Sequence, residues 1–174
     1  MSEEKHWYVG YVRSCQERRV ACALQAAGEE YYLPVRKERR RWSDRVKNVE
    51  VLLLKGMIFI RTNNARRIPL LQGIYGLCAF MADKSTHRPV TIPDTQMDAF
   101  MFMVDRSSKP VTVSTVHYSP GDRVRICSGS MQGLEGELVR IGGSHRLVIR
   151  LQNLLCAMVE VEVADVEKIN GFGQ

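Results

Sequence analysis

A run of arginines around one tryptophan carries the most recognisable binding chemistry in this sequence of 174 residues. The run, RKERRRWSDRVK from Arg36 to Lys47, contains seven basic and two acidic residues. Guanidinium groups pair with phosphates and an indole ring stacks on a base, so the run predicts a nucleic-acid contact. A solvated loop is the simpler interpretation of a charge run taken alone. We expect a basic loop here, with candidate nucleic-acid-binding side chains at Arg39, Arg40, Arg41 and Trp42.

The positive charge is unevenly distributed along the chain. The net charge is +6, and residues 118–174 carry six Lys or Arg against seven Asp or Glu. This C-terminal segment therefore has a net charge of −1, which leaves +7 on residues 1–117. A basic surface attracts phosphate groups, so we expect any nucleic-acid contact in the N-terminal part of the protein.

No pattern in the sequence predicts an active site. The five cysteines are odd in number without CxxC spacing, and the four histidines are scattered. No phosphate-binding glycine loop or local nucleophile motif occurs, so we expect no enzyme, no metal and no cofactor. The apolar runs are too short to span a membrane, and the N-terminus lacks the pattern of a secretory signal. These features predict a cytoplasmic protein without a membrane partner.

Hydrophobic periodicity predicts strands and helices in alternation over the first 104 residues. Strands are expected at residues 6–12, 30–35, 49–54, 57–61 and 74–81. A first helix begins with a capping box from Ser14 to Glu17 and ends at Gly28. Asn63 and Asn64 cap a second helix, which Pro69 shortens or kinks, and Asp94 caps a third. The inward residues are expected to be Val20, Ala23, Leu24 and Ala27; then Ala65, Ile68 and Leu71; then Met97, Phe100, Met101 and Val104.

The stretch from Pro120 to Ile141, PGDRVRICSGSMQGLEGELVRI, combines several β signals. Val124 and Ile126 alternate with arginines, as in a half-buried strand. Glycines follow at short intervals, where a tight barrel needs backbone conformations that side chains forbid. The stretch therefore predicts a strand, a glycine-rich bend and a second strand.

These elements predict an α+β fold in two domains. Residues 5–104 are expected to form an antiparallel sheet with helices packed on it. Residues 105–117, rich in Ser, Thr, Lys and Val, are expected to be a semi-extended linker. Residues 118–172 are expected to form a small β-barrel that stays β-structured, because its glycines and the alternation from Val159 to Val163 disfavour helix.

The C-terminal stretch resembles the KOW motif of transcription elongation factors and some ribosomal proteins. The resemblance is carried by PGDRVRI, by Ser128-Gly129 and by the segment GLEGELV from Gly133 to Val139. The residues of the motif are Gly121, Asp122, Val124, Gly129, Gly133 and Gly136.

The preceding part of the chain resembles the NusG N-terminal domain. The matching segments are Trp7-Tyr8-Val9, Glu17-Arg18-Arg19, KGMIFI from Lys55 to Ile60, and Arg88-Pro89. A KOW domain follows after a linker, as in NusG, so the resemblance covers nearly the whole chain. It implies a NusG-like α/β sandwich at residues 5–104 and a KOW β-barrel at 118–172.

The resemblance also implies function by attachment rather than by catalysis. NusG-like N-terminal domains bind the clamp helices of RNA polymerase and can contact non-template DNA or nascent RNA. The segment FFPGY of the family corresponds here to residues 53–57, so the implied polymerase-binding residues are Leu53, Leu54, Gly56 and Met57, together with Tyr11. Arg66 and Arg67 lie where relatives reach the opposite jaw of the polymerase.

Arg13 and Arg18 correspond to positions that contact DNA in sequence-reading relatives. Solvation alone is an equally good interpretation of each side chain. The KOW domain implies a second protein partner, which in the family is Rho or a small-subunit ribosomal protein.

Two departures from the family pattern are the LLKGM sequence in place of FFPGY and the extra arginines. They favour a specialised paralogue of the RfaH and UpxY type, with UpxY preferred. Such paralogues promote antitermination in surface or capsular polysaccharide operons. A general NusG acting at most genes and a ribosome-associated, RNA-binding KOW protein remain alternatives, and an enzyme is a distant third.

Overall fold

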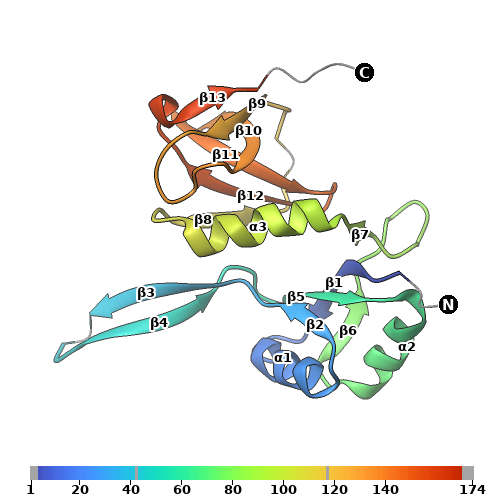
Figure 1. Ribbon diagram of the computed structural model, residues 1–174. Coiled ribbons are helices and arrows are strands. Elements are labelled where there is room, and N and C mark those ends of the chain that lie inside the picture. The colour runs from blue at the N-terminus through green and yellow to red at the C-terminus, as the bar shows by residue number, and fades with distance from the viewer. Residues whose placement is uncertain (1–3, 42, 117, 170–174) are drawn as a thin grey trace. The chain divides into compact units, whose positions relative to one another are not determined.

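The computed structural model describes residues 4–41, 43–116 and 118–169 (Figure 1). The chain forms two compact units that divide between Asp94 and Thr95. The domain limits expected from the sequence, 5–104 and 118–172, stay predictions. No helix among the described residues is long and apolar enough to cross a membrane.

An antiparallel sheet organises the first unit, with β1 (His6–Val12) in its interior. The strand order is β2 (Glu30–Tyr32), β5 (Met57–Thr62), β1 and β6 (Leu77–Phe80), and β7 (Thr91–Ile92) also pairs with β1. The strands predicted at 6–12, 30–35, 57–61 and 74–81 are confirmed, although the second and the last are shorter than expected, and β7 was not predicted. The segment 30–35 leaves the sheet before Pro34, which lacks an amide donor for the ladder.

Two helices, α1 (Glu17–Ala26) and α2 (Asn64–Gly73), pack on one face of this sheet. Successive side chains of a strand point to opposite faces, so Tyr8 and Val12 share the face that the helices cover. The core between sheet and helices consists of Tyr8, Val12, Val20, Ala21, Leu24, Ile58, Ile60, Leu70, Ile74, Leu77 and Phe80.

The capping box predicted at Ser14 is wrong. Helix α1 begins at Glu17, and its N-cap residue Gln16 makes no side-chain cap hydrogen bond. Cys15 has a positive φ of 62°, which turns the backbone before the helix can start. The Glu17 carboxylate accepts a hydrogen bond from the Gly56 amide instead. The predicted end is confirmed: Gly28 has a φ of 71° just after the C-cap residue Ala27.

The inward face predicted for α2 is partly wrong. The Asn63 side chain caps the helix by accepting from the Arg66 amide at 2.9 Å, as expected. Leu70 is the buried residue of the helix, whereas Ala65 and Ile68 are exposed and Leu71 is half-buried. The predicted residues have helical spacing, but the side of the helix that packs on the sheet is the one with Leu70 and Leu71. Arg67 lies on this side too, where it stacks on aromatic rings.

The basic segment is a two-stranded ribbon and not the expected loop. Strands β3 (Val35–Arg41) and β4 (Val46–Leu52) pair antiparallel as a separate sheet. Figure 1 shows the ribbon extending away from the other strands of its unit. Both faces of its outer half are exposed, so no apolar alternation marks it in the sequence, and cross-strand hydrogen bonds satisfy the backbone instead.

The second unit contains α3 (Asp94–Arg106) and a six-stranded antiparallel sheet. The sheet order is β13 (Val166–Lys168), β9 (Asp122–Ile126), β10 (Glu135–Ile141), β11 (Ser144–Leu151), β12 (Leu155–Glu160) and β8 (Val111–Ser114), with a 3₁₀ turn, η1, at Val163–Asp165. No pairing among the described residues joins β13 to β8, so the expected closed barrel is not shown. On α3, Met97, Phe100 and Met103 are buried, whereas Met101 and Val104 are only half-buried.

Strand β8 lies within the segment expected to be a linker. Its residues Val111 and Val113 alternate with Thr112 and Ser114, and the strand pairs with β12 over its whole length. β-branched residues favour a pleated surface, which explains why this stretch joins the sheet once a partner strand is available.

Two glycines permit close approaches in the second sheet. A Cβ at Gly121 would lie 2.1 Å from the Leu138 carbonyl oxygen, and one at Gly136 would lie 2.9 Å from the Val148 carbonyl oxygen. Gly136 is therefore required in β10 because a side chain would not fit there. The sequence had suggested a different reason, a backbone conformation that only glycine adopts easily. Gly129 and Gly133 have positive φ in the turn before β10, as predicted.

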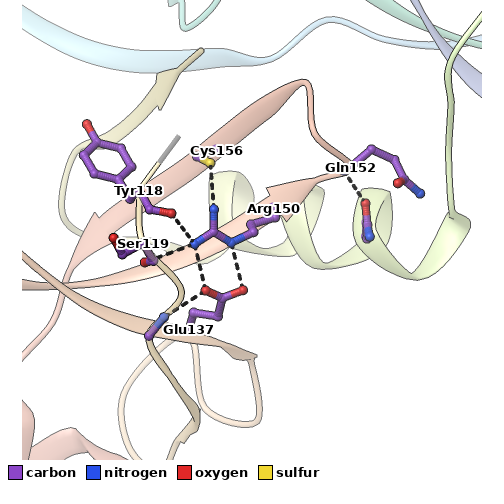
Figure 2. A network of polar contacts seen from close by, with 8 residues as sticks. Tyr118, Ser119, Glu137, Arg150, Gln152 and Cys156 are labelled. Atoms are coloured by element: carbon purple, nitrogen blue, oxygen red, sulfur yellow. Dashed lines mark hydrogen bonds and ion pairs between the residues drawn. The ribbon is translucent and has the colours of Figure 1, made fainter. Parts of the chain in front are cut away.

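A bidentate ion pair holds the segment between β8 and β9 against this sheet. Figure 2 shows the Arg150 guanidinium between the Glu137 carboxylate, the Tyr118 and Ser119 carbonyls and the Cys156 sulfur. Arg150 Nε and Nη2 each lie 2.9 Å from an oxygen of Glu137, and Nη2 also donates to the Tyr118 carbonyl at 2.9 Å. The Gly121 amide donates to Glu137 at 3.2 Å. One arginine thus ties β10 and β11 to the segment that leads into β9.

We expect Gly121→Ala to destabilise the protein by about 3 kcal/mol, because the added methyl group would collide with backbone of β10. Urea denaturation of the full chain measures the free energy of unfolding. Gly73→Ala is the matched control, since a Cβ there meets nothing within 4 Å. Equal stability of the two variants would contradict this packing.

The Glu137–Arg150 pair should make stability depend on pH. Hydrogen bonds from Arg150 lower the pKa of Glu137. Its contribution is therefore present above the unfolded pKa and is lost as pH falls through the folded pKa. We expect Glu137→Gln to cost about 2 kcal/mol at pH 7, and this difference to shrink below about pH 4. A pH series of melting curves tests this, with Glu160→Gln on the exposed surface as control; a constant difference would contradict it.

Candidate functional site

An apolar row crosses the first sheet on the face opposite α1 and α2. Tyr11 of β1 pairs with Met57 of β5 on one side and with Ala79 of β6 on the other. Directly opposed residues of antiparallel strands point to the same face, so these three side chains are neighbours. Tyr11 is 38% exposed, Ala79 is exposed and Met57 is half-buried. Sequence reasoning named Tyr11 and Met57 but missed Ala79, which only strand pairing connects to them.

The turn between β4 and β5 leads directly into Met57. Leu54 is buried and Leu53 is half-buried, so only Leu53 of this pair has surface to offer a partner. Gly56 has a φ of 73°, a conformation that favours glycine. The Val12 amide donates to the Gly56 carbonyl at 2.8 Å, and the Gly56 amide donates to Glu17 at 2.8 Å. The apolar row and this turn form one continuous stretch of the first unit, from here on the apolar surface.

Arg13 lies in a second cluster with two residues that sequence reasoning missed. The guanidinium carbons of Arg13 and Arg19 lie 5.2 and 5.3 Å from the centroid of the Tyr75 ring, and Tyr75 is 62% exposed. Hydrogen bonding to Cys78, and then the Tyr75 side chain, raise the pKa of Arg13, which keeps this group charged. Tyr75 was missed because a strand was predicted at 74–81, whereas the residue lies in a turn before β6. Gly76, which follows it and has a positive φ, was the available turn signal.

Arg18 points to the basic ribbon. Its Nη1 lies 3.0 Å from Glu50 Oε2 of β4, and Nη2 reaches the Glu50 carbonyl oxygen at 3.4 Å. Both side chains are largely exposed, so the pair is worth little in stability. The contact nevertheless joins α1 to the ribbon and removes Arg18 from the Tyr75 cluster.

The two faces of the ribbon differ in how their charges are paired. Arg36, Glu38 and Arg40 share one face, where Glu38 pairs with both arginines. Lys37, Arg39 and Arg41 share the other face with Glu50, Asn48 and Val46, their directly paired residues of β4. Within the described ranges, no ion pair engages Arg39 or Arg41. Trp42, the remaining predicted residue of this group, lies outside the described residues.

Arg66 and Arg67 lie on α2, away from the apolar surface. Arg66 pairs with Glu29 at 2.9 Å, and the Arg67 guanidinium stacks over Tyr8 and Phe80 at 5.3 and 5.8 Å from their centroids. Tyr8 belongs to the face that α1 and α2 cover. The structure therefore gives these arginines intramolecular partners and does not bring them together with Tyr11 or Met57.

The six residues of the C-terminal motif lie in the second sheet and its turns. Asp122 pairs with Lys168 at 3.0 Å, and Val124 is buried in β9. The four glycines, Gly121, Gly129, Gly133 and Gly136, serve the turn and the close approaches described above. In the described structure, the motif residues thus build the sheet and its turns.

The protein carries no cluster of potential metal ligands within the part that the structure describes. Cys15, Cys22, Cys78 and Cys127 are exposed, and only Cys156 is buried, where desolvation raises the pKa of its thiol.

Comparison with known proteins gives a family and a fold. Residues 5–101 match the family model described as NusG, transcription termination factor nusG. A structure titled domain interaction in Thermotoga maritima NusG is 22% identical with a TM-score of 0.51, covering 96% of this chain and 98% of its own. A chain of the MjSpt4:Spt5 complex in conformation A is 13% identical with a TM-score of 0.32, covering 94% and 97%. No curated protein matches the sequence.

We expect the ribbon to bind DNA through the face that carries Arg39 and Arg41. Replacing both by Ala should lower affinity and reduce the slope of log K against log salt by about 1.8, since each lost phosphate contact removes about 0.9. The double variant Arg36→Ala with Arg40→Ala is the matched control, because it removes the same charge from the other face. Fluorescence anisotropy with forked DNA over a salt series measures both. Equal losses would mean that only net charge matters.

Proposed function

The chain belongs to the NusG family, and from that premise we propose that it is a transcription elongation factor that binds RNA polymerase and promotes antitermination. It acts by attachment and carries out no catalysis. The apolar surface docks on the clamp helices of the polymerase, and the arginine-rich surfaces hold non-template DNA or nascent RNA nearby.

The observation that carries the proposal is the register of β1 with β5 and β6. It lines up Tyr11, Met57 and Ala79 on one face, beside the turn with the half-buried Leu53. An apolar row of this kind suits the side of a helix, and the flexible Met57 side chain adapts to what it meets. Polymerase clamp helices offer such a partner, and the family match over residues 5–101 supports that assignment.

The nucleic-acid contact is supported by charge that the fold leaves available. Arg39 and Arg41 point from one face of the ribbon, and Arg13 and Arg19 flank an exposed tyrosine ring. Guanidinium groups bind phosphates, and exposed aromatic rings stack on unpaired bases. Two basic surfaces on one unit fit a factor that holds DNA strands while it is bound to the polymerase.

The second unit is proposed to be a KOW domain that recruits another protein. Its glycine-rich motif and six-stranded antiparallel sheet support this, and closure of that sheet into a barrel is part of the proposal. Rho or a small-subunit ribosomal protein is the expected partner. Attachment of both units to one chain raises the local concentration of this partner at the polymerase.

We further propose that the factor serves particular operons, such as those for surface or capsular polysaccharides, in the manner of UpxY. The residues at 53–57, LLKGM, lack the aromatic residues and proline of the FFPGY segment, and the ribbon is unusually rich in arginine. The alternative is a general factor acting at most genes. Such a factor does not need to recognise a specific sequence, so it would not require the cluster of Arg13, Arg19 and Tyr75.

A single-round transcription assay with cognate polymerase tests the proposal. We expect more read-through of a terminator behind an operon leader than behind an unrelated leader. Met57→Asp should abolish this effect and weaken polymerase binding more than about tenfold, because a charge would be buried in an apolar interface. Ile68→Asp, an exposed change on α2, is the control.

Each outcome separates the alternatives. Equal read-through on both leaders would favour a general factor. Full polymerase binding by Met57→Asp would exclude the apolar surface. Failure of the wild-type chain to bind polymerase, with cosedimentation with ribosomes, would favour the ribosome-associated alternative.

A further inference from the structure

We propose that Glu17 is a positioning residue for the apolar surface: its buried carboxylate fixes the Gly56 turn and thereby sets the geometry in which Leu53 and Met57 meet the polymerase. This inference rests on the proposed function, since it concerns the affinity of that same surface. Glu17 itself is too buried to contact a partner, because only 4% of its surface is exposed.

The burial of Glu17 calls for a physical reason. A carboxylate is costly to bury without a donor. Glu17 Oε1 accepts a hydrogen bond of 2.8 Å from the Gly56 amide, a residue far away in the sequence. Glu17 is also the first residue of α1, where the positive end of the helix dipole and free backbone amides favour a negative charge. The Glu17 side chain therefore points from the start of the helix to the Gly56 turn.

The Gly56 peptide groups are held from two sides. Its amide donates to Glu17, and its carbonyl accepts from the Val12 amide at the end of β1 at 2.8 Å. A φ of 73° turns the chain sharply between these two bonds. A Cβ at this position would lie 3.4 Å from the Val12 carbonyl oxygen, so the site has room but an unfavourable backbone for other residues. The Glu17 bond is thus one of the two hydrogen bonds that hold Gly56.

The anchored turn is where the apolar surface begins. Met57 follows Gly56 directly and starts β5, opposite Tyr11. The Leu53 amide donates to the Pro34 carbonyl at 2.9 Å, so the other end of the turn is tied to the chain before β3. Without the Glu17 bond, the Gly56 amide would need another acceptor, and the turn could adopt several conformations. Binding would then have to order the turn, which weakens affinity.

The experiment compares Glu17→Ala with Glu17→Gln in the full chain. Alanine removes the acceptor, whereas glutamine keeps a side-chain oxygen in reach of the Gly56 amide. We expect Glu17→Ala to weaken polymerase binding about tenfold, the equivalent of one lost buried hydrogen bond, and Glu17→Gln to restore most of the affinity. Amide hydrogen exchange, resolved at Gly56, should be faster in the alanine variant than in the glutamine variant.

Measurements below the unfolding transition of each variant keep local and global effects apart. Exchange at the Ile60 amide, in the interior of β5, reports on the fold and should be unchanged. If Glu17→Ala were to unfold the unit, Glu17→Gln would carry the test: it must bind polymerase like the wild type and protect Gly56. A folded Glu17→Ala variant with wild-type affinity or with a protected Gly56 amide would overturn the inference.

Met57→Asp distinguishes this inference from the function on which it rests. Loss of binding by Met57→Asp with wild-type binding by Glu17→Ala would refute the positioning role alone. Wild-type binding by both variants would refute the apolar surface itself. Loss by both, with recovery in Glu17→Gln, is the result expected.

Discussion

The backbone of β1 is the constraint on which the first unit depends. This strand pairs with β5, β6 and β7, and its end is bonded to two turns that carry candidate binding residues. The Val12 amide holds the Gly56 carbonyl, and the next amide, that of Arg13, holds the Gly76 carbonyl at 2.9 Å. Main-chain hydrogen bonds therefore hold one side of each turn, and the Glu17 carboxylate holds the Gly56 amide in addition.

Acidic residues decide which arginines of the first unit remain available. Glu50 engages Arg18, Glu38 engages the arginines of one ribbon face, and Glu29 engages Arg66. Exposed ion pairs of this kind add little stability, but they orient side chains and neutralise charge locally. Among the described residues, no ion pair engages Arg39 and Arg41 on the other ribbon face, or Arg13 and Arg19 beside Tyr75. The net charge, which is known from the sequence, does not distinguish the paired arginines from the unpaired ones.

Two features hold the segment before β9 in the second unit: the close packing of Gly121 against the backbone of β10 and the half-buried ion pair of Glu137 and Arg150. Gly121 lies so close to the carbonyl oxygen of Leu138 that no side chain fits, and Arg150 joins the adjoining segment to β10 and β11. A bidentate guanidinium–carboxylate pair has a defined geometry, unlike apolar contacts, which accept many arrangements. The pair thus links β10, β11 and the segment before β9 through one guanidinium group.

The sequence by itself determined the features that arise from neighbouring residues. The approximate positions of β1, β2, β5 and β6, the Asn63 cap, the Gly28 helix end and the β character of the C-terminal motif follow from local patterns of residue type and spacing. The sequence predicted a strand at 49–54, which overlaps β4, but tertiary structure alone decided its pairing with β3, the phase of α2 and the partner of Glu17. It also brought Tyr11, Met57 and Ala79 into one row, because strand register depends on pairing between distant segments, for which a single sequence contains no local signal.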